Sequence, residues 1–223
     1  MLPLCCLATA AKAQISASAS LVSDYRFRGI SLSDGQPALT VSLAYDHSSG
    51  AYAGVSLIGQ DTAHDGARML GNIEYIGYAT RKSMGLSWDV GIHNENLTAY
   101  ADKKYVLHYT ELYAGMTSNN FSTHLYYSPN YLKAGAITLY ADLDGALRPA
   151  SQWRLFGHVG VQTPLGPPDI QPNRRERYDF RAGIAREFQR CEVDLAWATT
   201  SLTPANQVLP SRAGLVLSVS YFF

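Results

Sequence analysis

The chain has 223 residues; its 18 basic and 18 acidic side chains cancel, and charged residues make up only 16% of it. This length fits one or two soluble domains or one membrane barrel. The balanced charge excludes the basic surface expected of a nucleic-acid-binding protein. The mean hydropathy is −0.10, and no apolar run approaches the roughly 20 residues that a membrane-spanning helix requires. Transmembrane β-strands fit this composition, because they present apolar side chains on one face only.

Residues 1–13 have the pattern of a signal peptide. A short apolar run leads to small residues at Ala11 and Ala13, an A-x-A pattern that favours cleavage before Gln14. The basic stretch that usually opens such a peptide is missing, so we expect the true start to lie upstream. The mature domain is therefore predicted to comprise residues 14–223.

From Gln14 onward the sequence alternates with period two, which is typical of a half-buried β-strand. We expect a first strand over residues 14–28, long enough to cross a membrane, since a tilted span needs about 9–11 residues. In this register Tyr25 and Phe27 face the lipid at the outer rim. Asp24, Arg26 and Arg28 lie on the opposite, inner face.

The same alternation predicts eleven further strands. The last one ends in Tyr221 and Phe223, which are expected to face lipid at the inner rim while the strand closes the barrel against the first. The sequence thus predicts an all-β, transmembrane, antiparallel up-and-down β-barrel of about 12 strands. The outward apolar residues that mark the eleven segments span Leu39–Tyr45, Ala53–Leu57, Met69–Tyr75, Trp88–Ile92, Thr110–Met116, Phe121–Tyr127, Ile137–Leu143, Trp153–Val161, Tyr178–Ile184, Val193–Trp197 and Leu215–Phe223.

The connections alternate in length, as in transmembrane barrels with both termini on the inner side. A soluble sandwich or lipocalin-like barrel would show the same period but is disfavoured, because the apolar face is rich in Ala, Gly and Leu. Short turns are expected at His47–Gly50, Arg81–Gly85, Ser118–Asn120 and Glu187–Arg190, a longer one at Asp144–Ser151, and long loops at Gln60–Arg68, Asn94–Lys104, Pro164–Glu176 and Thr199–Ser211. Aromatic residues form two rims, Tyr45, Trp88, Phe121 and Trp153 at one end and Tyr25, Phe27, Tyr127 and Trp197 at the other.

The inner face of the predicted barrel carries nearly all the strand charges, because charge facing lipid is costly. In one interpretation, opposed acidic and basic rows line a constriction that orients polar solutes. In the other, the same groups pair across a narrow lumen and brace it shut, and Arg26 and Arg28 pair with Asp24 rather than bind an anion. The candidate lumen residues are Asp24, Arg26, Arg28, Glu74, Glu111, His158, Asp179, Arg181 and Asp194.

Few residues suggest catalysis. Ser122, His124 and Ser128 share one face of a predicted strand, but no nucleophile motif such as G-x-S-x-G occurs. The histidines show no metal-binding spacing, and we interpret His47, His64 and His124 as solvated. We therefore predict no enzyme, no catalytic residue, no cofactor and no metal.

Three segments resemble the TorF-type porin family, also called Gcw_chp. Ser23–Ser31, followed by Ser33-Asp34-Gly35 and Pro37-Ala38, is similar to the family's opening motif. Ser49–Val55 is similar to its hairpin after the second strand, and Tyr109–Gly115 with Tyr126–Pro129 to its central segment. The proline-rich stretch from Gln162 to Arg177 departs from the family.

That family is described as porin-like and located in the outer membrane, without an assigned substrate or catalytic residue. The resemblance implies a channel in the bacterial outer membrane for passive passage of small polar solutes or ions. A non-conducting structural or adhesion barrel, or a lipid-modifying enzyme, are the alternatives. The expected partners are outer-membrane lipid, small polar solutes and the barrel-assembly machinery, which would bind the C-terminal strand ending at Phe223.

Overall fold

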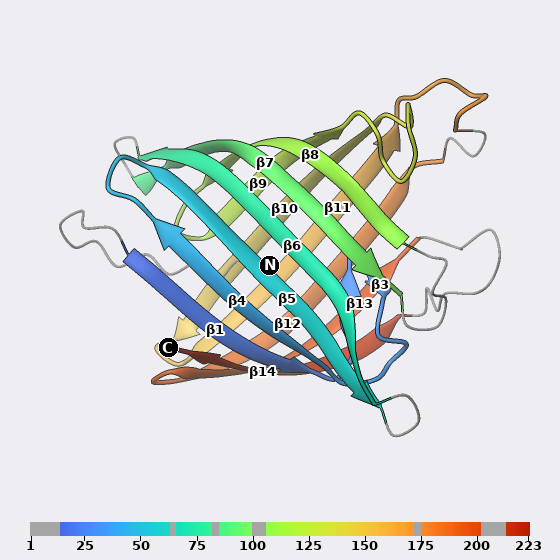
Figure 1. The fold of residues 1–223 in the computed structure, drawn as a ribbon. Helices are drawn as coiled ribbons and strands as arrows, with labels where there is room; N and C mark the ends of the chain where they lie inside the picture. The colour runs from blue at the N-terminus through green and yellow to red at the C-terminus, as the bar shows by residue number, and fades with distance from the viewer. Residues whose placement is uncertain (1–13, 63–65, 82–84, 100–105, 172–174, 202–212) are drawn as a thin grey trace.

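Twelve antiparallel strands close into one barrel in the computed structural model, which describes residues 14–62, 66–81, 85–99, 106–171, 175–201 and 213–223 (Figure 1). Each barrel strand pairs with the barrel strands before and after it in the sequence, and the first pairs with the last. Two short strands, β2 (Arg26–Phe27) and β3 (Ile30–Ser31), follow β1 in the sequence and form a separate two-stranded sheet. The barrel strands are β1 (Gln14–Val22), β4 (Ala38–Asp46), β5 (Ala51–Thr62), β6 (Gly66–Arg81), β7 (Ser87–Thr98), β8 (Val106–Thr117), β9 (Phe121–Ser128), β10 (Thr138–Ala150), β11 (Trp153–Pro164), β12 (Arg177–Phe188), β13 (Cys191–Thr200) and β14 (Gly214–Phe222).

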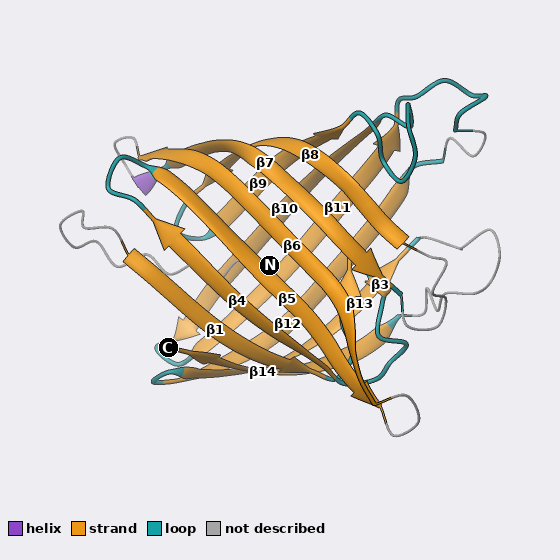
Figure 2. Cartoon of the chain, in the orientation of Figure 1, coloured by secondary structure: helices purple, strands orange, loops and turns teal. Residues whose placement is uncertain are grey.

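The predicted fold class and strand number are confirmed: the chain is almost entirely strand and turn (Figure 2). Closure also occurs where the sequence predicted it, because β1 pairs with β14. Ser20 lies opposite Ser220, and their hydroxyl oxygens are 2.8 Å apart on the inner face. Within the described residues, no helix is long and apolar enough to cross a membrane.

The barrel wall is apolar on its outer face. Large apolar side chains are exposed there on every barrel strand, among them Ile15, Leu43, Ile76, Val90, Leu112, Leu143, Leu195 and Leu217. A protein dissolved in water would hide these side chains, whereas lipid solvates them. The soluble-barrel alternative is therefore wrong.

The connections also follow the predicted alternation. Short turns lie at the end of the barrel where β1 begins and β14 ends, which we call the turn end, and the longer connections lie at the opposite, loop end (Figure 1). Three boundaries differ from the prediction. β5 continues to Thr62 and β6 begins at Gly66, inside the long loop expected over 60–68, and β7 continues to Thr98, into the loop expected over 94–104. β10 continues to Ala150, with a register shift after Leu147, and only Ser151 and Gln152 join it to β11. The expected long connection over 144–151 is thus mostly strand. The expected signal peptide, 1–13, lies outside the described residues.

The first predicted strand divides into two parts. The wall strand β1 ends at Val22, and the chain turns inward instead of continuing to Arg28. Residues 23–35, which we call the inner hairpin, carry β2 and β3 and lie inside the barrel. Tyr25 and Phe27 pack against a buried apolar cluster there. The prediction that these two aromatic residues face lipid was wrong.

A β-bulge in β6 overturns a second prediction. The pairing of β5 with β6 shifts between Ile58 and Gly59, and Gly71 adopts a φ of 144° that favours glycine. The extra residue reverses which side chains face inward from there on. Ile73 therefore packs against the buried cluster inside the barrel.

Glu74 consequently lies on the outer face, where it is exposed and accepts a hydrogen bond of 3.0 Å from Asn72 Nδ2. It shares this face with Ile76 and Tyr78, both exposed. Glu74 is thus not a lumen residue, and its predicted place in a constriction was wrong. A bulge cannot be read from alternation alone, because one inserted residue restores period two in the opposite phase.

Candidate functional site

Asp24 organises the inner hairpin. Its carboxylate accepts hydrogen bonds from Arg26 Nε at 2.6 Å, from Ser31 Oγ at 2.5 Å and from the backbone NH of Gly35 at 3.2 Å. The hydroxyl of Ser33 donates a further bond at 3.2 Å. A buried carboxylate is stable only when its oxygens are satisfied in this way. The predicted pairing of Arg26 with Asp24 is confirmed.

The hairpin turns at Arg28 and Gly29, which both have positive φ, 46° and 75°. Two-residue type I′ turns require this conformation and usually take Asn-Gly or Gly-Gly. Arginine at the first position is unfavourable by about 1–3 kcal/mol, so the surrounding contacts must hold it. Gly29 lies directly against β13: a Cβ there would be 2.5 Å from the carbonyl oxygen of Thr199.

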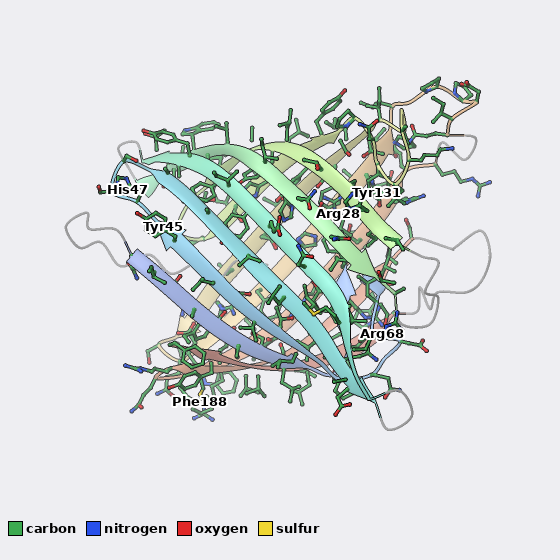
Figure 3. All side chains as sticks on the ribbon, viewed as in Figure 1. Arg28, Tyr45, His47, Arg68, Tyr131 and Phe188 are labelled. Atoms are coloured by element: carbon green, nitrogen blue, oxygen red, sulfur yellow. The ribbon has the colours of Figure 1, made fainter. Side chains whose placement is uncertain are left out.

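This turn carries the side chain of Arg28 to the far wall. Its Nη2 lies 2.5 Å from Glu111 Oε2 on β8, and its Nη1 donates to Oε1 at 3.1 Å, so the pair is bidentate. The guanidinium also stacks on Tyr140, with its Cζ 3.8 Å from the ring centroid. Figure 3 shows Arg28 within the outline of the barrel, near Tyr131. Arg28 therefore pairs with Glu111 and not, as one prediction had it, with Asp24.

The electrostatic surroundings keep Arg28 charged. Burial disfavours the charged form, but Tyr109 and the carboxylates of Glu111 and Glu95 outweigh it and raise the pKa of Arg28 above its usual value. The hydroxyl of Tyr25 lies in the same region, and burial together with Glu95 raises its pKa as well. The hairpin thus places one permanent cation in a region lined by carboxylates.

Apolar packing also holds the hairpin in place. Ile30 and Leu32 of the hairpin are buried, and a fully buried side chain of this size contributes roughly 1.5–3 kcal/mol. Much of the inner face of the wall is apolar at this level, contrary to the expectation of a polar lumen, although Glu95 and Glu111 are buried there as well. The buried cluster comprises Ile30, Leu32, Ala38, Ile58, Leu70, Leu97, Ala99, Leu107, Tyr109 and Tyr131.

Towards the turn end the interior becomes polar. The hydroxyl of Tyr52 donates to Asp89 Oδ2 at 2.7 Å and lies 2.6 Å from that of Tyr113. His124 lies between two carboxylates, each 3.6 Å away, Asp89 and Asp142. Our interpretation of His124 as merely solvated was therefore wrong. Among the hydrogen bonds between described residues, none joins it to Ser122, the partner that the enzyme hypothesis needs.

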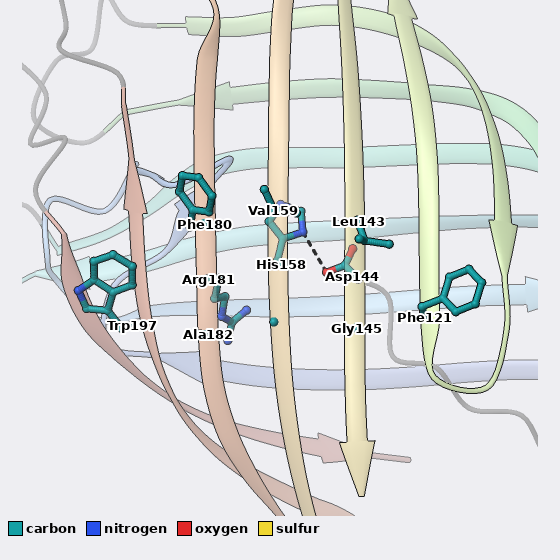
Figure 4. Close-up of a pocket in the computed structure, with 11 residues that line it drawn as sticks. Phe121, Leu143, Asp144, Gly145, His158, Val159, Phe180, Arg181, Ala182 and Trp197 are labelled. Atoms are coloured by element: carbon teal, nitrogen blue, oxygen red, sulfur yellow. Dashed lines mark hydrogen bonds and ion pairs between the residues drawn. The ribbon is translucent and has the colours of Figure 1, made fainter.

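A second histidine holds two carboxylates together. His158 Nδ1 lies 2.9 Å from Asp144 Oδ1 (Figure 4). Its Nε2 lies 2.9 Å from Asp179 Oδ1. The hydroxyl of Tyr140 lies 3.2 Å from Asp179 Oδ2, which links this group to the ring beneath Arg28. Donors and acceptors on seven strands, β5 and β7 to β12, thus form a polar surface inside the barrel.

Nearer the turn end, arginine–carboxylate pairs line the interior. Arg181 donates to Asp194 at 2.8 Å, and Ser218 donates to the other oxygen of the same carboxylate. Arg154 donates to Glu192 at 2.5 Å. The arginines of these pairs are more exposed than Arg28, 21% for Arg154 and 26% for Arg181 against 11%.

The outer, lipid-facing surface of the wall has a depression beside His158, where three neighbouring residues have little or no side chain. Gly145, Gly157 and Ala182 are adjacent in register, flanked by Phe121 and Trp197. They line a depression of about 560 Å³ (Figure 4). The large apolar residues around it face lipid, so the depression is not part of a solute path.

Most predicted lumen residues thus meet inside the barrel. Prediction missed Glu95, which it placed in a loop over 94–104, although β7 continues to Thr98. Extending the alternation of Asp89 and His93 by one step would have placed it inward. The residues that the structure brings to the interior are Asp24, Arg26, Arg28, Glu111, His158, Asp179, Arg181 and Asp194.

Known structures share this architecture at low sequence identity. The KdgM porin superimposes with a TM-score of 0.51 and 10% identity, over 94% of this chain and 98% of the other. The NanC porin gives 0.53 and 7%, over 93% and 98%. The COG4313 outer membrane channel from Pseudomonas putida F1 gives 0.52 and 13%, over 96% of each. These likenesses show the fold of outer-membrane porins and agree with the predicted location, the bacterial outer membrane.

At the level of sequence, the chain matches one family. No curated protein matches the chain. One family model does, over residues 8–208, and its description is "Bacterial protein of unknown function (Gcw_chp)". The match covers most of the chain, including the inner hairpin and eleven of the twelve barrel strands, β1 and β4 to β13. The chain is therefore a member of the Gcw_chp family, as the motifs around Ser23–Gly35 suggested.

Proposed function

We propose that the protein is an outer-membrane channel for the passive passage of small polar solutes or ions, with the inner hairpin as its narrowest part. The observation that carries this proposal is the enclosed polar surface of tyrosine, histidine and carboxylate groups between β5 and β13. A barrel that served only as a structural element would gain nothing from polar groups that water reaches. Solutes need such groups to replace their hydration on the way through.

Ion pairing within the lumen is compatible with a passage. Twelve strands are intermediate between eight, which enclose a filled interior, and sixteen to eighteen, which enclose a water channel. The pairs involving Arg154 and Arg181 join neighbouring regions of one side of the wall, β11 to β13. The pair of Arg28 with Glu111, by contrast, reaches from the hairpin to a distant strand, β8. Bracing is thus concentrated in the hairpin, and the rest of the lumen is free to line a path.

Conductance of the purified barrel in planar lipid bilayers tests the proposal. Folding is verified first, by the altered electrophoretic mobility that folded barrels show before boiling. We expect discrete conductance steps. Asp89→Asn should change the ion selectivity, because it removes an inner charge while keeping the hydrogen bonds to Tyr52. Glu74→Gln is the matched control, since its carboxylate lies on the outer face.

Two results would contradict the channel. Folded protein that never conducts would favour the alternative, a structural or adhesion barrel. Equal effects of the two variants on selectivity would mean that ions do not pass the inner carboxylates. The predicted partner of the terminal strand, the assembly machinery, stays a prediction.

A further inference from the structure

The geometry points to a binding site for a divalent transition-metal cation of the Zn²⁺ type, formed by His93, Glu95 and Glu111 beneath the inner hairpin. The two strands that carry these residues are adjacent: His93 lies opposite Glu111, and Glu95 lies opposite Tyr109. All four side chains therefore project from one small patch of the inner wall. One ligand atom from each of the three ionisable residues lies within 4.8 Å of the others.

The burial of the Glu95 carboxylate and its lack of hydrogen bonds to the described residues favour a bound cation. The Glu95 side chain is 0% exposed, and within the described residues neither carboxylate oxygen has a hydrogen-bond partner. His93 Nδ1 lies 2.7 Å from Glu95 Oε1, an ion-pair distance when the imidazole is protonated. A metal ion can take the place of that proton between the two side chains, and it would also satisfy the second carboxylate oxygen, Glu95 Oε2.

Tyr109 provides a second, separate observation. Within the described residues its hydroxyl is buried without a hydrogen-bond partner, and Tyr109 lies directly opposite Glu95 in the pairing of β7 with β8. A buried polar atom without a partner is rare and costly. Three such side chains, His93, Glu95 and Tyr109, adjoin one another here, so a ligand that all of them can approach accounts for the group.

The charges favour a cation as well. Glu95 and Glu111 bring two negative charges, and Arg28 compensates one of them through its bidentate pair with Glu111. A second cation would balance the other, since an uncompensated buried carboxylate is strongly unfavourable. A carboxylate has about four lone-pair positions, so Glu111 can bind a metal ion and Arg28 together.

The donor set selects the class of metal. An imidazole nitrogen with two carboxylate oxygens suits Zn²⁺ and related transition metals, whereas Ca²⁺ and Mg²⁺ prefer oxygen ligands throughout. Zn²⁺ holds such ligands at about 2.0–2.2 Å, which places them roughly 3.4 Å from one another. Modest rotation of the three side chains brings them to that spacing. Our sequence-based prediction of no metal site missed this group, because it placed Glu95 in a loop.

Metal binding to the purified, folded barrel tests the site without reference to conduction. Protein stripped with EDTA is titrated with Zn²⁺ by calorimetry, and bound metal is counted after gel filtration. We expect one Zn²⁺ per chain, a higher temperature of unfolding when it is bound, and weaker binding of Ca²⁺ and Mg²⁺. His93→Gln and Glu95→Gln should each weaken binding by more than the roughly 10–100-fold that loss of an outer-shell partner costs.

The control is His158→Gln, which removes a histidine that also lies between two carboxylates, Asp144 and Asp179. This variant should bind Zn²⁺ as the unchanged protein does. Folded protein that binds no Zn²⁺, or that binds it equally well in all three variants, would overturn the site. Glu95→Gln keeps the shape of the side chain and removes its charge, so it is expected to fold. A non-conducting barrel that binds Zn²⁺ through these residues would contradict the channel and leave the metal site standing.

Discussion

The two halves of the lumen differ in how their ion pairs are buried. At the level of the inner hairpin, Glu111 is 0% exposed and its partner Arg28 11%. At the turn end, the pair of Arg148 and Glu187 is 53% and 35% exposed. The wall is built of the same alternating strands in both halves. The difference follows from position: the hairpin packs inside the barrel around Arg28 and Glu111, whereas Arg148 and Glu187 lie near the ends of β10 and β12, at the rim.

This contrast separates two roles of charge within one barrel. A pair sealed from water is costly to break, because the remaining partner is left charged and unsolvated. A pair that water reaches contributes little to stability, but its charges are available to a passing solute. We therefore expect stability to depend on the hairpin half and selectivity on the turn-end half.

Removal of the hairpin should have the largest effect. Replacing residues 24–35 by a short Gly-Ser linker takes away Arg28 and the buried side chains of Ile30 and Leu32. Conductance per channel should rise several-fold in planar bilayers, since the part that excludes water is gone. Unchanged conductance in a barrel shown to be folded would mean that the passage is narrowest elsewhere.

Breaking the sealed pair should have the next largest effect. Arg28→Gln leaves Glu111 buried and unpaired, which should cost about 3–5 kcal/mol in the free energy of unfolding, measured by denaturant titration in detergent. The double variant Arg28→Gln with Glu111→Gln removes both charges and should recover part of that loss. A single variant as stable as the unchanged protein would show that water reaches the pair.

Breaking the exposed pair of Arg148 and Glu187 should have the smallest effect. Arg148→Gln at the turn end should change the free energy of unfolding by no more than about 1 kcal/mol, since the pair with Glu187 is largely exposed. The same denaturant titration measures it beside Arg28→Gln. Equal losses in the two variants would remove the distinction between the halves.

The strands of the barrel wall could be predicted from the sequence, because successive side chains of a membrane-spanning strand point alternately to the lipid and to the lumen. The closing strand is an example: Val219 and Tyr221 face outward and Ser218 and Ser220 inward, as period two predicts. The inner hairpin could not be separated from the wall in this way. Its short strands alternate too, so Asp24 to Arg28 looked like a continuation of β1.

The prediction of the candidate site was also wrong where the chain departs from simple alternation. Glu74 was assigned to the wrong face because the bulge at Gly71 shifts the phase without breaking the pattern. The pairing of Arg28 with Glu111 joins residues 83 positions apart, and no local pattern encodes such a contact. One local sign was present, the Arg28-Gly29 pair at the end of the supposed strand, since glycine as the second residue is typical of a two-residue turn.

The position of the hairpin between β1 and β4 has a consequence for the seam of the barrel. It follows the first strand of the chain, yet it contacts the last two: Gly29 abuts Thr199 on β13, and Arg26 Nη2 lies against Gly214 at the start of β14. The strands that close the barrel are therefore held in two ways, by the pairing of β14 with β1 in the wall and by the hairpin from within the lumen.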